Sequence, residues 1–224
     1  LKDITVDMLI NHKGGFDREK SFDPMFADIK IAKALGIASP PDKYQIASYM
    51  MGQKLDFKPG SKEVYSNYGY ALLGMIIEKV TGKTYIQFVQ EDFFAPMDVK
   101  DVYLAQTLPE NRRPDEPYYS CPAKGPSAFK PGTQVCWPDG GWSIEVMDAH
   151  GGILTSAHAL GVFLSNYCLG TGAKLGESKS CGDWWFYGSL DGTLALIRQN
   201  SNGSAYALIF NKREDKTHKN YEDI

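Results

Sequence analysis

The sequence predicts one α+β domain in which helices come first and an antiparallel sheet comes last. Segments with helical spacing of apolar residues recur up to about residue 97, whereas the C-terminal part holds three short apolar runs separated by turn residues. The 224 residues are 43% hydrophobic and 12% aromatic, enough to bury a real core. We therefore expect residues 1–150 to form a mostly helical lobe with a long loop, and residues 151–224 to form a helix and a three-stranded meander.

Each helix expected in the first lobe has a start or stop signal. The first ends in a glycine pair, the second begins at a proline and an aspartate and ends near Gly52, and the third is closed by Thr-Gly-Lys. Thr84 caps the fourth, and Pro96 ends its pattern. The expected helices cover residues 4–11, 41–53, 67–80 and 85–97.

The second half of the chain begins with a long irregular stretch. Residues 98–144 are dense in Pro, Gly and polar side chains and show no sustained period. Residues 151–170 read as a helix capped by Thr155 or Ser156. Three apolar runs within 183–211 are then separated by Asp-Gly and by Asn-Ser-Asn-Gly-Ser, which is typical of antiparallel hairpins.

Composition excludes several classes of function. The net charge is −3 and neither sign forms long blocks, so no nucleic-acid or anionic-membrane partner is expected. The longest apolar stretch, at 70–77, is far shorter than the ~20 residues of a membrane span. No cofactor motif occurs, and the cysteines lack the spacing of a zinc site. The chain begins without an initiator Met or signal-peptide features, so we expect an upstream segment.

The four cysteines are expected to form two local disulfides. Cys121 and Cys136 bracket one turn-rich loop, and Cys168 and Cys181 bracket another. Even pairing of this kind suits an oxidising compartment, so the protein is expected to be secreted or periplasmic. Four unrelated buried thiols are the alternative.

Three blocks of the sequence stand in the order and at about the distances found in one enzyme superfamily. They are "FKPGSKEVYSNYGYALLGMIIEKVTGKTY", "MDAHGGILTSAHALGVFL" and "GSLDGTLALIRQ" with "AYALIFNKRED". The chain resembles the serine β-lactamase and penicillin-binding protein superfamily, most closely its class C and esterase-like branch, over nearly its whole length. The resemblance implies a helical lobe beside an antiparallel sheet flanked by helices, with a cleft between them.

The resemblance also implies a covalent mechanism, in which a Ser of an SxxK motif attacks an ester or amide. By position, Tyr65 matches the general base and Asn67 the contact to the substrate amide. Tyr65 is expected just before the helix that starts near Asn67, facing the strand around Gly188. Gly188 and Ser189 match the strand whose backbone N–H helps to form the oxyanion hole. Tyr187 and His150 are candidate substrate contacts near the cleft, and Ser66 has no implied role.

Two departures from the family pattern qualify these assignments. The SxxK Ser of the family lies upstream of "ITVDMLINHKGG", and the SxxK match at Ser127 is followed by Pro131 and Gly132, so it cannot begin a helix. Phe186 stands where the family has Lys or His. Without these cations Tyr65 is expected to remain an ordinary protonated phenol, because a base near neutrality would need a pKa about three units lower.

Two hypotheses remain open. One is a serine hydrolase acting on an ester, a D-peptide or a β-lactam-like amide, with its nucleophile outside the given residues. The other is a degenerate member kept as a binding or structural protein. In either case a missing N-terminal segment or another chain is expected to complete the sheet, because the meander alone exposes an edge. The aromatic run 184–187 is interpreted as core packing, with a binding floor as the alternative.

Three histidines are not assigned to the candidate site. His12 is interpreted as a loop contact and His158 as a helix-surface residue, and His218 sits in a charged tail.

Overall fold

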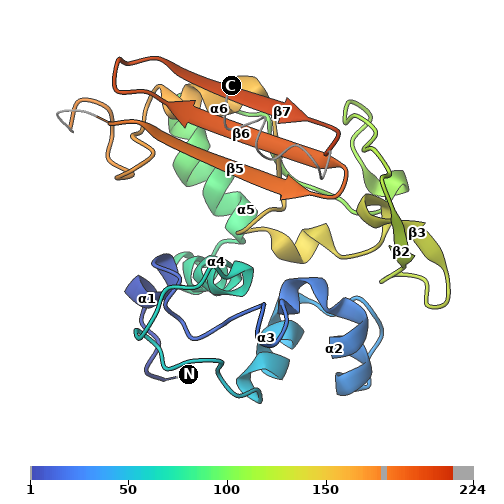
Figure 1. The fold of residues 1–224 in the computed structure, drawn as a ribbon. Helices are drawn as coiled ribbons and strands as arrows, with labels where there is room; N and C mark the ends of the chain where they lie inside the picture. The colour runs from blue at the N-terminus through green and yellow to red at the C-terminus, as the bar shows by residue number, and fades with distance from the viewer. Residues whose placement is uncertain (1, 178–180, 214–224) are drawn as a thin grey trace.

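Helices and sheet occupy adjoining regions of the computed structural model, which describes residues 2–177 and 181–213. Figure 1 shows the N-terminal helices grouped on one side and the C-terminal sheet on the other, with α5 (Tyr85–Phe88) and α6 (Ala157–Leu164) beside the sheet. The α+β class and the helical lobe followed by an antiparallel meander are confirmed.

The N-terminal lobe is built from short helices with strong caps. Thr5 caps the first, and Asp42 forms a reciprocal capping box with Gln45 at the start of α3. One helix, α2, was not predicted, because Ala27 precedes it without a side-chain cap. The elements are α1 (Val6–Ile10), η1 (Pro24–Phe26), α2 (Asp28–Leu35), α3 (Lys43–Met51) and α4 (Asn67–Thr81).

The helix predicted after Thr84 changes its winding as it proceeds. Thr84 forms a capping box with Gln87 at the start of α5 (Tyr85–Phe88). The chain continues as a π-helical turn, η2 (Val89–Phe94), and a 3-10 turn, η3 (Ala95–Met97). Asp98 follows in the left-handed region and ends the run.

The stretch 98–144, predicted to be irregular, contains short paired strands that the prediction missed. Three-residue strands carry no readable periodicity, and only their partners define them. Arg112 organises the region: its side chain is 8% exposed and donates to the carbonyls of Thr107 (2.7 Å) and Pro138 (2.6 Å). The pairs are β1 (Val102–Leu104) with β4 (Ile153–Thr155) and β2 (Lys124–Pro126) with β3 (Gln134–Cys136); the 3-10 turns are η4 (Pro109–Asn111), η5 (Trp137–Asp139) and η6 (Ile144–Met147).

The helix predicted over residues 151–170 is shorter than expected. Its first part is strand β4, and α6 (Ala157–Leu164) begins after Ser156, whose Oγ accepts a hydrogen bond from the Ala159 N–H. Of the two caps considered, Ser156 is therefore correct. The apolar run was misread because β4 and α6 are both apolar and contiguous.

The C-terminal sheet has the predicted three antiparallel strands, β5 (Trp184–Leu190), β6 (Thr193–Gln199) and β7 (Ala205–Phe210), in the order β5-β6-β7. Gln199 ties the sheet to α6, because its Nε2 donates to the Leu164 and Tyr167 carbonyls at 3.0 Å each. Directly paired residues of neighbouring strands share a face. Trp184, which pairs with Gln199, therefore lies on the α6 face of the sheet, as does Phe186.

Two hydrophobic clusters and two disulfides stabilise the described chain. In the larger cluster Trp142 is 5% exposed and stacks on Trp137 at 5.6 Å between ring centroids. The smaller cluster packs η2 and β1 against α6. The predicted disulfides, Cys121–Cys136 and Cys168–Cys181, are confirmed, with Cα atoms 5.3 and 4.9 Å apart.

Candidate active site

Ser66 fixes where α4 begins. Its backbone is extended, with φ −144° and ψ 114°, and its Oγ accepts a hydrogen bond from the Gly69 N–H at 3.0 Å. Ser66 is 8% exposed, so it is a buried helix cap and not a reactive group. The cap leaves Tyr65 just outside the helix, as predicted, and makes Asn67 its first residue.

Tyr65 presents a partly exposed phenol at this corner. Its side chain is 53% exposed, and its hydroxyl donates to Asn67 Oδ1 at 2.9 Å. The Arg18 guanidinium lies 5.2 Å from the ring centroid. The phenol is therefore a hydrogen-bond donor toward Asn67 and is reachable from solvent.

Asn67 is held from its other side by an aspartate. Its Nδ2 donates to Asp23 Oδ2 at 2.7 Å, and Asp23 Oδ1 accepts from the Met25 N–H at 3.0 Å, which caps η1. Asn67 is 8% exposed. A continuous chain of hydrogen bonds thus runs from Tyr65 through Asn67 to Asp23, joining α4 to the segment before η1.

His12, expected to be only a loop contact, is a central part of the corner. Its Nδ1 accepts the Ser66 N–H at 3.2 Å, and its ring lies 4.8 Å from that of Tyr65 and 5.0 Å from that of Tyr70. Burial lowers the His12 pKa, and the nearby Glu63 carboxylate opposes this. A neutral imidazole that accepts at Nδ1 carries its proton on Nε2, so His12 supports the corner and offers no free base there.

The electrostatic surroundings keep Tyr65 protonated at neutral pH. Burial is the largest cause that raises its pKa, and Asp23, Tyr70 and Tyr187 raise it further, while Arg18 lowers it. The structure therefore agrees with the expectation of a protonated phenol. The influence of Tyr187 also shows that β5 lies within electrostatic range of Tyr65.

The aromatic run on β5 is exposed, so its interpretation as core packing was wrong. Trp184 to Tyr187 are each between 42% and 51% exposed, because β5 is an edge strand of the described sheet. Trp185 and Tyr187 stack at 5.6 Å with an angle of 13° between their rings. Phe186 is 51% exposed and offers no proton or charge. The aromatic side chains are therefore open to solvent on β5, the strand whose Tyr187 lies within electrostatic range of Tyr65.

The other candidates on β5 have opposite environments. A Cβ built on Gly188 would meet no atom within 4 Å, so the backbone there is open to a ligand. The Ser189 Oγ is buried and has no hydrogen-bond partner among the described residues. A nucleophilic role for this hydroxyl is therefore disfavoured, whereas its backbone N–H stays a candidate oxyanion donor. The approach of Tyr65 to Gly188 remains a prediction.

His150 lies just after η6, near the end of β5. The adjacent Gly151 lies beside Leu190, with 4.0 Å from a built Cβ to Leu190 Cδ1. The His150 Nε2 is buried and makes no hydrogen bond to any described residue, and burial lowers its pKa to about 4. His150 is thus neutral at pH 7, and its role as a substrate contact stays a prediction.

The SxxK match at Ser127 is not a nucleophile site. Ser127 is 3% exposed, and its Oγ accepts the backbone N–H groups of Phe129 (3.2 Å) and Lys130 (3.0 Å) in a turn. The segment is not helical, as expected. Ser127 therefore closes a turn after β2.

A buried ion cluster that sequence reasoning missed holds the helices behind the site. The Lys43 Nζ lies 2.7 Å from Glu78 Oε1 and 2.5 Å from Asp148 Oδ2, and the three side chains are 13%, 11% and 7% exposed. These residues come from α3, α4 and the end of η6. Contacts 35 and 105 residues apart leave no periodic signal in the sequence.

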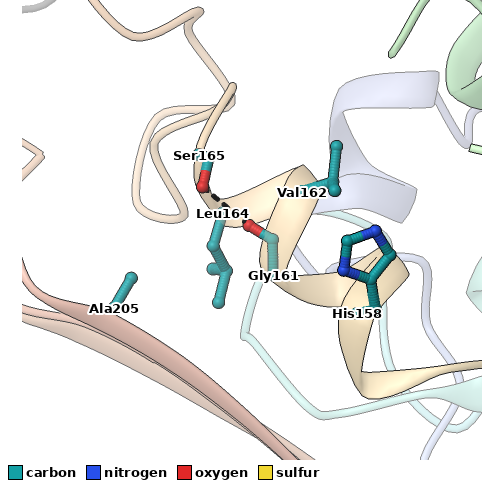
Figure 2. A pocket seen from close by; sticks show the side chains of 6 residues that line it. All are labelled: His158, Gly161, Val162, Leu164, Ser165 and Ala205. Atoms are coloured by element: carbon teal, nitrogen blue, oxygen red, sulfur yellow. Dashed lines mark hydrogen bonds between the residues drawn. The ribbon is translucent and has the colours of Figure 1, made fainter. Parts of the chain in front are cut away.

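The hollow shown in Figure 2 lies elsewhere. It has a volume of about 370 Å³. It is lined by four residues of α6, by the residue that ends that helix and by the first residue of β7: His158, Gly161, Val162, Leu164, Ser165 and Ala205. His158 is exposed on α6, as predicted, and His218 lies outside the described residues. Because β7 is at the opposite edge of the sheet from β5, this hollow is separate from the Tyr65 corner. Its lining offers no charged carboxylate or amine.

Neither a metal site nor a bilayer-spanning helix is found in the described part of the chain. No three His, Cys, Asp or Glu side chains within residues 2–177 and 181–213 gather closely enough to hold a metal ion. Over the same ranges every helix is too short or too polar to cross a membrane.

Comparison with known proteins gives consistent matches over much of the chain. A family model described as Beta-lactamase matches residues 1–180. The chain is 41% identical over 92 residues to a Dichelobacter nodosus protein provisionally described as fimbrial assembly protein FimD, serogroup D. It is 34% identical over 94 residues to an Escherichia coli (strain K12) protein provisionally described as a D-alanyl-D-alanine carboxypeptidase. These matches cover 41% and 42% of this chain but only 21% and 20% of those proteins.

A solved structure extends the similarity to the whole fold. The D-stereospecific amidohydrolase from a Streptomyces species superposes with a TM-score of 0.64 at 22% identity. The superposition covers 94% of this chain and 68% of that one. Helical lobe and C-terminal sheet are therefore arranged alike in the two proteins, and about a third of the Streptomyces chain has no counterpart here.

Proposed function

Because the chain belongs to the beta-lactamase family, we propose that it forms the Tyr65 side of the active site of a serine hydrolase. The reaction class is hydrolysis of an ester, a D-peptide or a β-lactam-like amide through an acyl-enzyme. The observation that carries this proposal is the half-exposed Tyr65 phenol, hydrogen-bonded to the buried Asn67 and within electrostatic range of Tyr187 on β5. A reachable proton donor beside an open edge strand is what such a site requires.

The nucleophile is proposed to come from a segment outside residues 1–224. Ser127 closes a buried turn and the Ser189 Oγ is buried, so neither suits attack on a carbonyl. In the proposed reaction the lysine of the same external SxxK motif would take the proton of the serine as the serine attacks the carbonyl. Tyr65 would give its proton to the leaving group, which departs as the acyl-enzyme forms, and the lysine would return a proton to Tyr65. Water then releases the acid. The Ser189 N–H would donate to the oxyanion, and Asn67 and Gly188 would contact the substrate backbone.

Relatives with D-stereospecific descriptions favour a substrate with a D-configured centre. One is a D-stereospecific amidohydrolase by its title, and the other is provisionally described as a D-alanyl-D-alanine carboxypeptidase. Tyr187 is proposed to contact the substrate from the middle of β5, and His150 from near the Leu190 end of that strand. The two disulfides favour an oxidising, extracytoplasmic location, because such bonds are rare in reducing compartments.

Phe186 favours a second candidate, a degenerate member that binds ligands without turnover. It is 51% exposed at the place where the resemblance expects a proton-bearing side chain. The raised Tyr65 pKa points the same way, because no neighbour creates a base at neutral pH. A degenerate member would keep the corner and the open Gly188 backbone as a binding site for the same ligands.

Labelling with a fluorophosphonate or a penicillin-type probe tests the proposal. Residues 1–224 alone are expected to give no acyl adduct, whereas a longer polypeptide with an upstream SxxK should label one serine. In that polypeptide Tyr65→Phe should slow acylation on the order of 100-fold or more, because it removes the proton-transfer group. The control is Tyr118→Phe, an 89% exposed tyrosine elsewhere on the surface.

Three outcomes separate the alternatives. Labelling of Ser127 would contradict the exclusion of that turn, and an unlabelled long polypeptide would favour the degenerate member. Phe186→His should raise turnover because it restores a proton-bearing group, with Trp184→His as the control on the same face of β5. No gain over that control would show that the position of Phe186 was assigned incorrectly.

A further inference from the structure

Asp23 ends the hydrogen-bond chain that begins at Tyr65, although it lies 44 residues from Asn67 in sequence. Its two oxygens have separate partners: Oδ1 accepts the Met25 N–H and Oδ2 accepts Asn67 Nδ2. One carboxylate therefore caps η1 and grips Asn67 at the same time. Capping requires only the first of these contacts.

The second contact decides which way the Asn67 amide faces. An amide side chain has an acceptor end and a donor end, and an ionised carboxylate can only accept. With Nδ2 bound to Asp23, the carbonyl Oδ1 must face the Tyr65 hydroxyl, at 2.9 Å. Turning the amide over would place its carbonyl oxygen against the carboxylate, which is repulsive. Asn67 is 8% exposed, so water cannot readily replace either partner.

We propose that Asp23 is a positioning residue of this site, which acts through Asn67 to keep the Tyr65 phenol protonated and donating. The positioning itself is argued from the contacts of Asp23 and Asn67, and only its use in catalysis rests on the proposed function. A phenolate at Tyr65 needs a donor, and Asn67 can offer an N–H only if it turns away from Asp23. Tyr65 is therefore set to give a proton to a departing group and not to take one from the nucleophile.

Other charged and titratable groups around Tyr65 do not replace Asp23. Arg18 lies over the ring and favours the phenolate, His12 is neutral and bonded to the Ser66 N–H, and Tyr70 and Tyr187 are phenols. Asp23 is thus the acidic group of this set, and it acts through both its charge and its hold on Asn67. Burial also raises the pKa of Asp23, opposed by its hydrogen bonds from Asn67 and Met25 and by Arg18.

The experiment places 2,3,5-trifluorotyrosine at position 65 and follows its ¹⁹F resonance against pH. This phenol is more acidic than that of tyrosine, so it titrates while the protein is folded. Asp23→Asn removes the charge, and Asp23→Ser keeps a capping hydroxyl for η1 but cannot grip Asn67. Both variants should move the titration midpoint to lower pH. Asp7→Asn is the matched control, because Asp7 also accepts from an asparagine, Asn11, at 3.1 Å in α1.

A folded Asp23→Ser protein with the wild-type midpoint would overturn the proposal and leave Asp23 as a cap only. If neither variant folds, the wild-type protein decides. The Asn67 side-chain ¹⁵N–¹H resonances should then shift in acid with a midpoint above that of an ordinary aspartate. Asn67 resonances that ignore acid would also refute the proposal. None of these measurements needs turnover, so they stand or fall separately from the hydrolase assignment.

Discussion

At the scale of single residues, one serine determines the geometry of the corner. Ser66 caps α4 with its side chain and donates its own N–H to His12, so it fixes the helix start and the imidazole together. Its neighbours Tyr65 and Asn67 are thereby held together, with the Tyr65 hydroxyl 2.9 Å from Asn67 Oδ1. Of these three consecutive residues, Ser66 is a helix cap, and Tyr65 and Asn67 are candidate site residues.

Asp28 is a second buried acid, and we expect it to make stability depend on pH. It is 3% exposed, its carboxyl oxygens lack well-aligned partners among the described residues, and burial raises its pKa to about 7. A raised carboxyl pKa means that the folded state holds the proton more tightly. The free energy of unfolding should therefore fall as the pH rises from about 4 to about 7.

Asp28→Asn should remove most of that dependence, because the amide has the same shape without the charge. At pH 8 the variant should exceed the wild type by roughly 1–4 kcal/mol, and at pH 4 the two should be close. Urea unfolding at both pH values measures this. Asp98→Asn, whose side chain is 90% exposed, is the control. Equal pH profiles for Asp28→Asn and the wild type would contradict the prediction.

At the scale of elements, Lys43 joins α3, α4 and the end of η6, and its loss should be costly. Lys43→Met would leave the Glu78 and Asp148 carboxylates buried without their cation. We expect a loss of about 3–5 kcal/mol, because an unpaired buried charge is far less stable than a paired one. Chemical denaturation at pH 7 tests this prediction.

Lys83→Met is a matched control for this change. Lys83 also contacts two carboxylates, Glu91 at 3.0 Å and Asp92 at 2.8 Å, but its side chain is 34% exposed. Surface pairs contribute about 0–1 kcal/mol. If the two variants lose equal stability, the buried cluster of Lys43, Glu78 and Asp148 does not stabilise the packing of the helices more than a surface ion pair does.

The elements that could be predicted are those whose signals are local. The start of α4 follows from Ser66 and the apolar run after it, and the meander follows from its turns. By contrast, α2 begins without a side-chain cap, and β4 is three residues that merge with the apolar start of α6. Pairing with a distant strand, not the strand's own sequence, makes β1 and β4 recognisable.

The same limit applies to the candidate site. Tyr65 and Asn67 were found through their resemblance to a family pattern. The hydrogen bonds that join Asp23 to Asn67 and His12 to Ser66 connect residues 44 and 54 positions apart, which one sequence cannot reveal. Exposure of the aromatic run on β5 was missed because strand composition does not show which strand lies at the edge.

At the scale of the whole molecule, the disulfides close two loops next to the sheet, and we expect both in the purified protein. Without reductant, iodoacetamide should label no thiol, and peptide mapping should recover Cys121 with Cys136 and Cys168 with Cys181. Replacing both cysteines of either pair with Ser should cost about 3 kcal/mol, because it frees a loop of 15 or 13 residues in the unfolded chain. Any labelled thiol in the unreduced protein would contradict this pairing.

The four tryptophans fall into two pairs with opposite surroundings. Trp137 and Trp142 stack within the larger hydrophobic cluster, whereas Trp184 and Trp185 are 45% and 42% exposed on β5. The protein thus contains two pairs of intrinsic fluorophores. The buried pair is expected to emit at shorter wavelength, and the solvent-exposed pair at longer wavelength. A soluble quencher reaches mainly the second, so the difference between quenched and unquenched emission isolates the light from the edge strand. Binding of a ligand near the edge strand can then be followed by the change in the emission wavelength of Trp184 and Trp185, without a label and without turnover.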